Sequence, residues 1–198
     1  MTFLLRFGAV CGLLSGLFIA LPGAVEAFTG ETAVTSFILG MSPALAVPLL
    51  TALHVGQMHA TGPLGSIGYA VNLIGLSLFG GAAYALNLVL YYLGETVTNN
   101  LATPTRSALL GSALVFTVGT VLFTIAMVRA RVYPRIPVWT YGISLPVFAI
   151  AARLPDTPLT SALHVVVGAT LAWLATAIWR RAALGDVVRT EMDAEGVS

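Results

Sequence analysis

Residues 65–93 read GSIGYAVNLIGLSLFGGAAYALNLVLYYL and contain no charged side chain. A membrane-spanning helix needs about 20 mostly apolar residues, so this stretch is long enough to cross the hydrocarbon layer with residues to spare. A helix of this length must tilt, break near Gly80 and Gly81, or extend into the headgroup region. The stretch therefore predicts that the chain is embedded in a membrane.

The composition of the whole chain also indicates a membrane protein. Of its 198 residues, 58% are hydrophobic and only 9% are charged, whereas soluble domains carry roughly 25% charged residues. The mean hydropathy is correspondingly high, at +0.93. A net charge of only +1 and a single cysteine exclude a nucleic-acid binder, a disordered chain and a disulfide-stapled secreted domain.

Five further uncharged runs accompany residues 65–93. Together they predict an all-α fold, a polytopic membrane helical bundle of six transmembrane helices that forms a single domain over residues 1–182. A short polar cytoplasmic tail is expected over residues 183–198. The expected helices cover about 7–25, 36–55, 65–93, 107–128, 137–152 and 159–179. The second and third of these meet at a cytoplasmic turn over residues 54–65.

The arginines orient this bundle, because short cytoplasmic segments collect basic residues. With the N-terminus in the cytoplasm, most arginines fall on the cytoplasmic side, and six crossings return the C-terminus to the same side. The cytoplasmic arginines are then Arg6, Arg129, Arg131, Arg135, Arg180, Arg181 and Arg189, and the outer ones are Arg106 and Arg153. We therefore expect a multi-pass protein of the cell (cytoplasmic) membrane with both termini inside.

The first apolar run has two interpretations. Arg6, the apolar stretch after it and the small residues around Glu26 are also typical of a cleaved secretory signal. Against cleavage, Gly8, Gly12 and Gly16 form a small-xxx-small series, which lets a neighbouring helix backbone approach closely. We expect a retained helix, with the signal peptide as the alternative.

Several short motifs carry a resemblance to a known group of proteins. They are Leu50 to His54, Thr61-Gly-Pro-Leu-Gly65 with Gly68 and Gly75, Tyr133-Pro-Arg-Ile-Pro137, and Trp173 with Trp179-Arg-Arg181. With these motifs the chain resembles small multi-pass bacterial membrane proteins, common in actinobacteria, that have no assigned function. The resemblance implies a six-helix bundle in a cell membrane and brings no catalytic residues with it.

The sequence offers little for catalysis. No ionisable side chain lies at the centre of an expected helix, which argues against an ion-coupled transporter. His54 and His59 lie at the opposite membrane face from His164, so the three cannot share one metal or haem iron. A hydrolase built on Ser161 and His164 has no evident orienting acid beyond Asp156 in the preceding loop. We therefore expect no enzyme activity, no metal site and no cofactor.

Uncharged polar residues inside the helices are the remaining candidates. Asn72 and Asn87 lie near one face of the third expected helix, with Tyr84 alongside. Such asparagines most often make interhelical hydrogen bonds, but they can also line a ligand cavity. Pro43, Pro48 and Pro146 are expected to kink helices and leave room, which predicts a pocket between the second, third and fifth helices.

Three functions remain open from the sequence. The expected one is a non-enzymatic scaffold, sensor or partner subunit in the membrane, which contacts the lipid bilayer and a membrane protein partner or further copies of itself. The alternative is a binder or carrier of a neutral lipid or small hydrophobic molecule, with Asn72, Tyr84 and Asn87 as the expected ligand-binding residues. The third is a membrane enzyme that uses the histidines.

Overall fold

The computed structural model describes residues 2–93, 95–151 and 157–195, and the side chains of all of these except 95, 99 and 185–195. These residues form helices and no strand, as predicted for an all-α fold. The elements are α1 (Thr2–Thr29), α2 (Ala33–Ala85), the π-helix η1 (Leu86–Leu90), α3 (Tyr91–Leu93), α4 (Glu95–Asn99), α5 (Thr103–Ala130), α6 (Arg135–Ala151) and α7 (Pro158–Glu195). Arg153 and the side chain of Arg189, which the orientation argument used, lie outside the described residues.

Four helices within the described residues are long and apolar enough to cross a membrane. They are Thr2–Thr29, Ala33–Leu93, Thr103–Ala130 and Pro158–Leu184. The chain is therefore a helical protein with the composition and helix lengths of a membrane protein. The helix α6 has 17 residues, and its length of about 26 Å falls slightly short of the roughly 30 Å hydrocarbon layer.

The helix α2 is divided at Gly62, whose φ of 56° and ψ of −156° are not helical. Only glycine adopts this region without a steric penalty. Pro63 follows, and a proline is favoured in the first turn of a helix because its missing N–H is not needed there. The break is narrower than the predicted turn over residues 54–65, because the helix continues to Thr61 and restarts at Pro63. We call residues 33–61 the first arm of α2 and residues 63–85 the second arm.

Of the three possibilities for residues 65–93, a break near Gly80 and Gly81 does not occur. The second arm stays helical through both residues and changes instead to a π-helix at Leu86–Leu90. The helix α7 is also longer than expected, because it continues to Glu195 rather than ending near residue 179.

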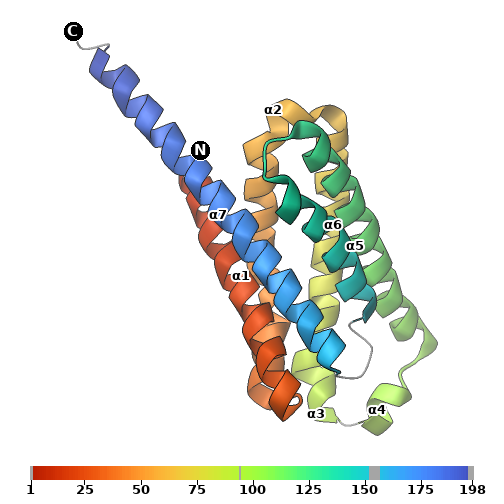
Figure 1. Cartoon of the computed structure of the whole chain (residues 1–198). Helices are drawn as coiled ribbons and strands as arrows, with labels where there is room; N and C mark the ends of the chain where they lie inside the picture. Colours follow the sequence, from red (N-terminus) through yellow and green to blue (C-terminus); the bar gives the residue numbers. More distant parts are fainter. Residues whose placement is uncertain (1, 94, 152–156, 196–198) are drawn as a thin grey trace.

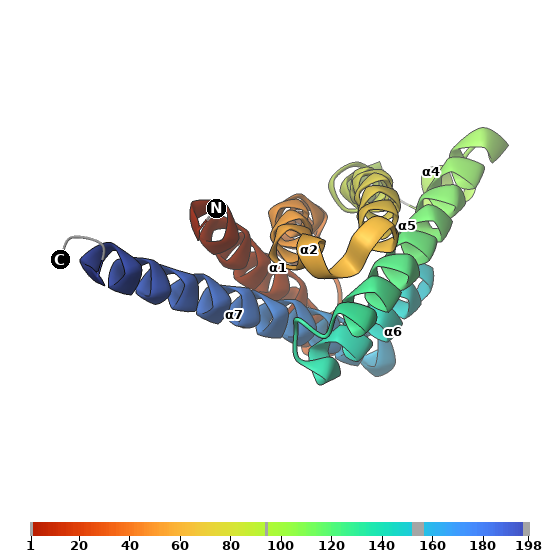
Figure 2. The same cartoon turned by 90° about the horizontal axis from the view of Figure 1, so that it is seen from above.

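The helices form a bundle, and we call the end that carries Arg6, Arg129, Arg131 and Arg135 the basic end. The start of α1, the break in α2 and the turn between α5 and α6 all lie at one end, whereas α3 and α4 lie at the other (Figure 1). Seen from above, α1 lies beside α7, and α6 lies between α5 and α7 (Figure 2). At the basic end, the guanidinium carbon of Arg6 lies 5.5 Å from the ring centroid of Trp179, which ties α1 to α7.

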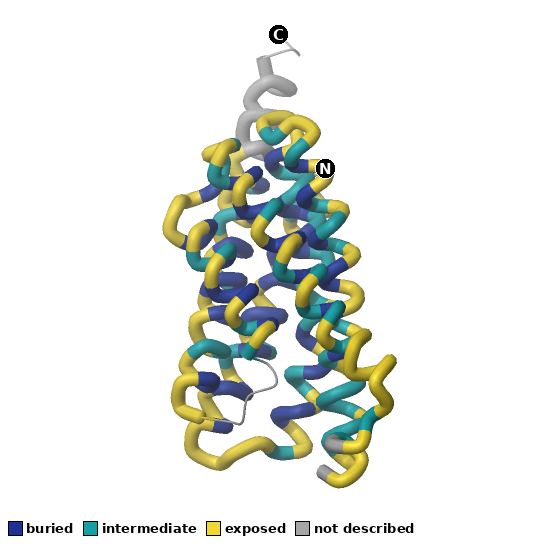
Figure 3. Tube along the Cα trace, turned by 90° about the vertical axis from the view of Figure 1, so that its right-hand side faces the viewer, coloured by how far each residue is buried: buried dark blue, intermediate teal, exposed yellow. Residues whose placement is uncertain are grey.

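Glycines allow the closest helix contacts. A Cβ added at Gly16 of α1 would lie 2.5 Å from the carbonyl oxygen of Gly168 in α7, and one at Gly8 would collide with Ala52 of α2. The close approach predicted for the first glycine series is therefore confirmed. The second arm of α2 meets α5 in the same way, since a Cβ at Gly75 would lie 2.5 Å from the Cα of Phe116. Buried residues follow these inner faces, and exposed residues cover the outside (Figure 3).

Candidate functional site

Asn72 lies at a buried polar junction between three helices. Its Nδ2 donates to the hydroxyl oxygen of Tyr141 in α6 at 2.9 Å, and its Oδ1 accepts from the hydroxyl of Thr120 in α5 at 3.1 Å. Asn72 and Thr120 have no exposed surface, and Gly119 packs directly against the backbone of Asn72. The amide therefore joins the second arm of α2 to α5 and α6 by hydrogen bonds within the protein.

The other two predicted ligand-binding residues lie elsewhere. Asn87 is in η1, about 22 Å from Asn72 along the helix axis, and its Nδ2 donates to the carbonyl oxygen of Ala83 one turn earlier, at 2.8 Å. Tyr84 is half exposed on the outside of the bundle. The structure does not bring Asn72, Tyr84 and Asn87 together, and none of the three lines the two hollows described below. A ligand at these residues stays a prediction.

The histidines pack separately in the two ends of the bundle. His54 stacks on Tyr69 with ring centroids 4.3 Å apart, and His59 is exposed beside the break in α2. His164 contacts the edge of Phe148, and its Nδ1 lies 2.7 Å from the carbonyl oxygen of Thr160 rather than on Ser161. Among the residues described, no three His, Cys, Asp or Glu side chains gather in a metal-binding arrangement.

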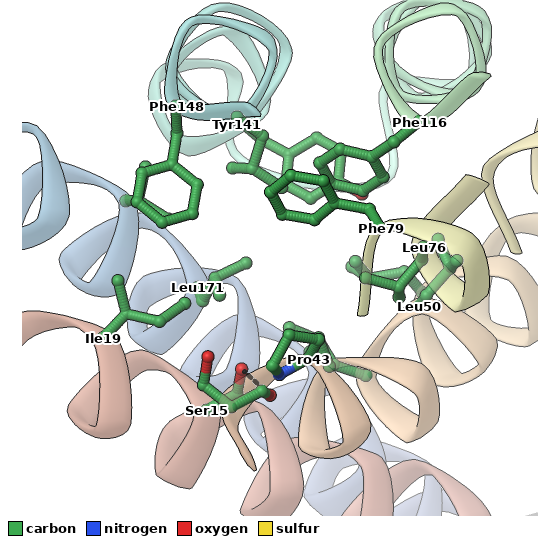
Figure 4. A pocket seen from close by; sticks show the side chains of 16 residues that line it. Ser15, Ile19, Pro43, Leu50, Leu76, Phe79, Phe116, Tyr141, Phe148 and Leu171 are labelled. Atoms are coloured by element: carbon green, nitrogen blue, oxygen red, sulfur yellow. Dashed lines mark hydrogen bonds between the residues drawn. The ribbon is translucent and has the colours of Figure 1, made fainter. Parts of the chain in front are cut away.

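A cavity lies at the centre of the bundle, where α1, both arms of α2, α5, α6 and α7 meet (Figure 4). The small side chains of Ser15, Pro43 and Ala46 face it from α1 and the first arm. Two further polar residues, Ser42 and Tyr141, also line the cavity. The other lining residues are larger and apolar: Ile19, Leu49, Leu50, Leu53, Leu76, Phe79, Phe116, Leu145, Phe148, Val167 and Leu171.

Aromatic rings close one side of this cavity. Phe79 from α2 stacks on Phe116 from α5 with centroids 5.0 Å apart. Phe148 from α6 meets Phe79 edge-on at 6.3 Å. In Figure 4 these rings face Ile19, Pro43 and Leu171 across the open space. The rings and the side chains opposite them leave the space between them unfilled.

The polar groups at the cavity wall are already hydrogen-bonded. The hydroxyl of Ser15 donates to the carbonyl oxygen of Ser42 at 2.9 Å. The hydroxyl of Ser42 in turn donates to the carbonyl oxygen of Leu39 at 2.8 Å. Tyr141 accepts from Asn72. A molecule in the cavity would therefore meet an apolar surface, which favours hydrocarbon over a polar ligand.

The size of the cavity limits what it can hold. The cavity has a volume of about 40 Å³. An engineered apolar cavity of about 150 Å³ holds benzene, and sites for whole drug-sized ligands measure about 300–1,000 Å³. The cavity therefore has room for the end of a slim alkyl chain and not for a ring system such as haem.

Sequence reasoning found part of this site. It placed a pocket between the second, third and fifth expected helices, and residues from all three line the cavity. It missed the contributions of α1, α5 and α7, above all Phe116 and Leu171. The available signal was weak: Phe79 and Phe116 look like ordinary core residues in the sequence, and only the fold sets them opposite Ser15 and Ala46.

Some buried polar atoms have no hydrogen-bond partner among the described residues. Both amide atoms of Gln57 are in this state although the side chain is only 2% exposed, and the hydroxyl of Ser144 is a second example. Near Gln57, the hydroxyl of Tyr133 donates to the carbonyl oxygen of Leu53 at 2.9 Å. Burial raises the pKa of the Tyr133 phenol well above its usual range, and the positive charge of Arg181 acts in the opposite direction.

Comparisons with known proteins found no relative of this chain. No family model, curated protein or solved structure matches the chain.

Proposed function

We propose that the chain is a non-enzymatic, multi-pass protein of the cell membrane that binds the apolar chain of a neutral lipid or similar molecule at the centre of its bundle. The observation that carries the proposal is the central cavity, whose wall is apolar and comes from every long helix. A hydrocarbon chain is the apolar ligand that a surrounding membrane would supply to such a cavity.

The proposal includes six membrane-spanning segments. The two arms of α2 run in opposite directions from Gly62 and count as two of them, α1, α5 and α7 add three, and the shorter α6 is the sixth. The position of α6 between α5 and α7 supports its inclusion, because a helix packed along both of them lies at the same depth.

We place both termini in the cytoplasm. The start of α1, the α2 break and the turn between α5 and α6 lie at one end of the bundle, and Arg6, Arg129, Arg131 and Arg135 belong to these segments. An excess of arginine on one side is the usual mark of the cytoplasmic face. This orientation puts Arg106, at the start of α5, on the outer face.

The size of the cavity narrows the ligand to a slim alkyl or isoprenoid chain end. The remainder of such a molecule would leave the bundle between the helices. Filling the cavity with a larger side chain should therefore exclude the ligand. Ala46→Leu adds three carbons at the cavity wall, whereas Ala44→Leu adds the same carbons two residues away at an exposed position.

The test is native mass spectrometry of the protein extracted gently from its own membranes. We expect a mass excess of one apolar molecule on the wild type and on Ala44→Leu, and its loss from Ala46→Leu. Bare wild-type protein, or equal ligand on both variants, would reject the cavity as the site. A spectrum with a second protein and no small molecule would favour the scaffold or partner-subunit function.

A further inference from the structure

A second hollow, an open groove, runs along α6 beside the start of α7. It is lined by Ile143 and Val147 of α6 and by Leu163 and Val166 of α7, and its volume is about 560 Å³. Ile143 and the cavity residue Leu145 are two positions apart, so they point to nearly opposite sides of α6. The groove is therefore a separate site, and its volume lies in the range of sites for whole ligands.

One end of the groove is positively charged. Arg135, the first residue of α6, lines the groove and is exposed. The first backbone N–H groups of a helix have no intrahelical partner and carry a partial positive charge, which adds to that of the guanidinium. Trp139 lies one turn further along the groove, and tryptophan is typical of the boundary between headgroups and hydrocarbon.

The length of the groove matches one leaflet of a membrane. From Arg135 to Val147 it follows twelve residues of α6, which corresponds to roughly 18 Å at 1.5 Å per residue. Half of the hydrocarbon core of a bilayer is about 15 Å thick. A basic group at the headgroup level, with an apolar groove as deep as one leaflet below it, matches the headgroup and acyl chain of a phospholipid.

We infer that the α6–α7 groove binds one anionic phospholipid, with its phosphate on Arg135 and an acyl chain along Ile143 and Val147. The positive end of the groove favours an anionic headgroup over a zwitterionic one. The hydroxyl of Ser144 also lines the groove without a hydrogen-bond partner. The inference does not depend on the central cavity.

The test measures lipid binding to the full chain in phosphatidylcholine nanodiscs with and without phosphatidylglycerol. Native mass spectrometry of the released protein counts retained lipids as phosphatidylglycerol is titrated. The wild type should retain one phosphatidylglycerol in preference to phosphatidylcholine. Arg135→Gln should weaken this binding roughly tenfold, the usual effect of losing a hydrogen bond to a charged group. Arg129→Gln also removes one arginine charge, but from the end of α5 outside the groove, and should change phosphatidylglycerol binding less than about twofold.

A second pair of variants tests the groove itself. Ile143→Trp fills the groove from an exposed position and should abolish retention of the phosphatidylglycerol. Ile125→Trp makes the same change on the exposed face of α5 and should leave retention unchanged. Ala46→Leu should also keep this lipid, so the two sites can fail separately. Equal retention of both lipids by the wild type, equal effects of the two arginine variants, or a lipid-free dimer that Ile143→Trp disrupts would overturn the inference.

Discussion

The contact between α5 and the second arm of α2 and the contact around the central cavity solve the same packing problem in opposite ways. In the first, Gly75 and Gly119 remove side chains so that the backbones touch, and Asn72 is hydrogen-bonded across the contact. In the second, Phe79 and Phe148 face Ile19, Pro43 and Leu171 across a space that these side chains do not fill. The two regions lie side by side, and Tyr141 contributes both to the hydrogen bonds of the first and to the cavity wall of the second.

The difference shows where this bundle tolerates change. Helices in a membrane gain little from the hydrophobic effect when they associate, so close packing and hydrogen bonds hold them together. The glycine contacts supply that close packing, and this leaves the central wall free to keep a cavity. Added side-chain volume should therefore lower the free energy of unfolding strongly at the contact between α5 and the second arm of α2, and hardly change it at the cavity wall.

The largest effect is expected from Gly119→Ala. The new methyl group would collide with the Cα and backbone nitrogen of Asn72, and backbone atoms cannot move aside as a side chain can. We expect a loss of about 3 kcal/mol in the free energy of unfolding, at the upper end for overpacking. Thermal or denaturant unfolding in detergent measures it.

Gly111→Ala is the matched control on the same helix, because nothing lies within 4 Å of a Cβ at this position. It should stabilise the protein by about 0.5–1 kcal/mol, since alanine is the better helix former. Equal effects of the two variants would show that α5 does not press on α2 at Gly119.

The two asparagines provide the next comparison. Asn72→Leu leaves the hydroxyls of Tyr141 and Thr120 without their buried partner, which should cost about 1–2 kcal/mol of stability. Among the described residues, the Asn87 side chain hydrogen-bonds only to Ala83 one turn earlier, so Asn87→Leu should change the free energy of unfolding by less than about 0.5 kcal/mol. The measurement is the unfolding midpoint of each variant, with ligand retention recorded on the same samples. Ligand loss without loss of stability would instead identify Asn72 as a ligand-binding residue.

The sequence predicted the helical segments because hydrophobicity and charge are local properties. The uncharged runs located all the long helices, and Gly62 with Pro63 marked the break in α2. Helix ends were less certain, because α7 extends past its apolar run to Glu195. The sequence left open whether residues 65–93 tilt, break near Gly80 and Gly81, or extend into the headgroups. The structure has no break there, since Gly80 packs against Pro43 inside an intact helix.

The site was harder to predict, because a cavity depends on pairs of residues far apart in the chain. Asn72 was correctly marked as a polar residue in need of a partner, but nothing in the sequence indicated that Tyr141 and Thr120 would supply it. The cavity depends on Phe116 meeting Phe79, and on Ser15 facing both. These distances are set by glycines on neighbouring helices, and so they are known only after folding.

A smaller effect is expected at the basic end of the bundle. Tyr133→Phe removes the hydrogen bond to the carbonyl oxygen of Leu53, which should cost about 1 kcal/mol at neutral pH. Because burial raises the folded pKa of the Tyr133 phenol above the unfolded value of 10.0, its contribution is present below pH 10 and is lost as pH rises above that value. Melting temperatures of both proteins from pH 8 upward should therefore converge above pH 10. A constant difference would contradict the burial of this phenol.

A nearly neutral effect on stability is expected from filling the cavity. Ala46→Leu adds three carbons where a cavity of about 40 Å³ lies, and filling such a space is worth at most about 1 kcal/mol. Part of that gain is lost to side-chain ordering, so the unfolding free energy of the ligand-free protein should stay within about 1 kcal/mol of the wild type. A single methyl group at Gly119 would then cost more than three carbons at Ala46. That inversion is what a bundle with tight glycine contacts around a hollow centre requires, and a large loss of stability in Ala46→Leu would mean that the centre is packed as tightly as its edges.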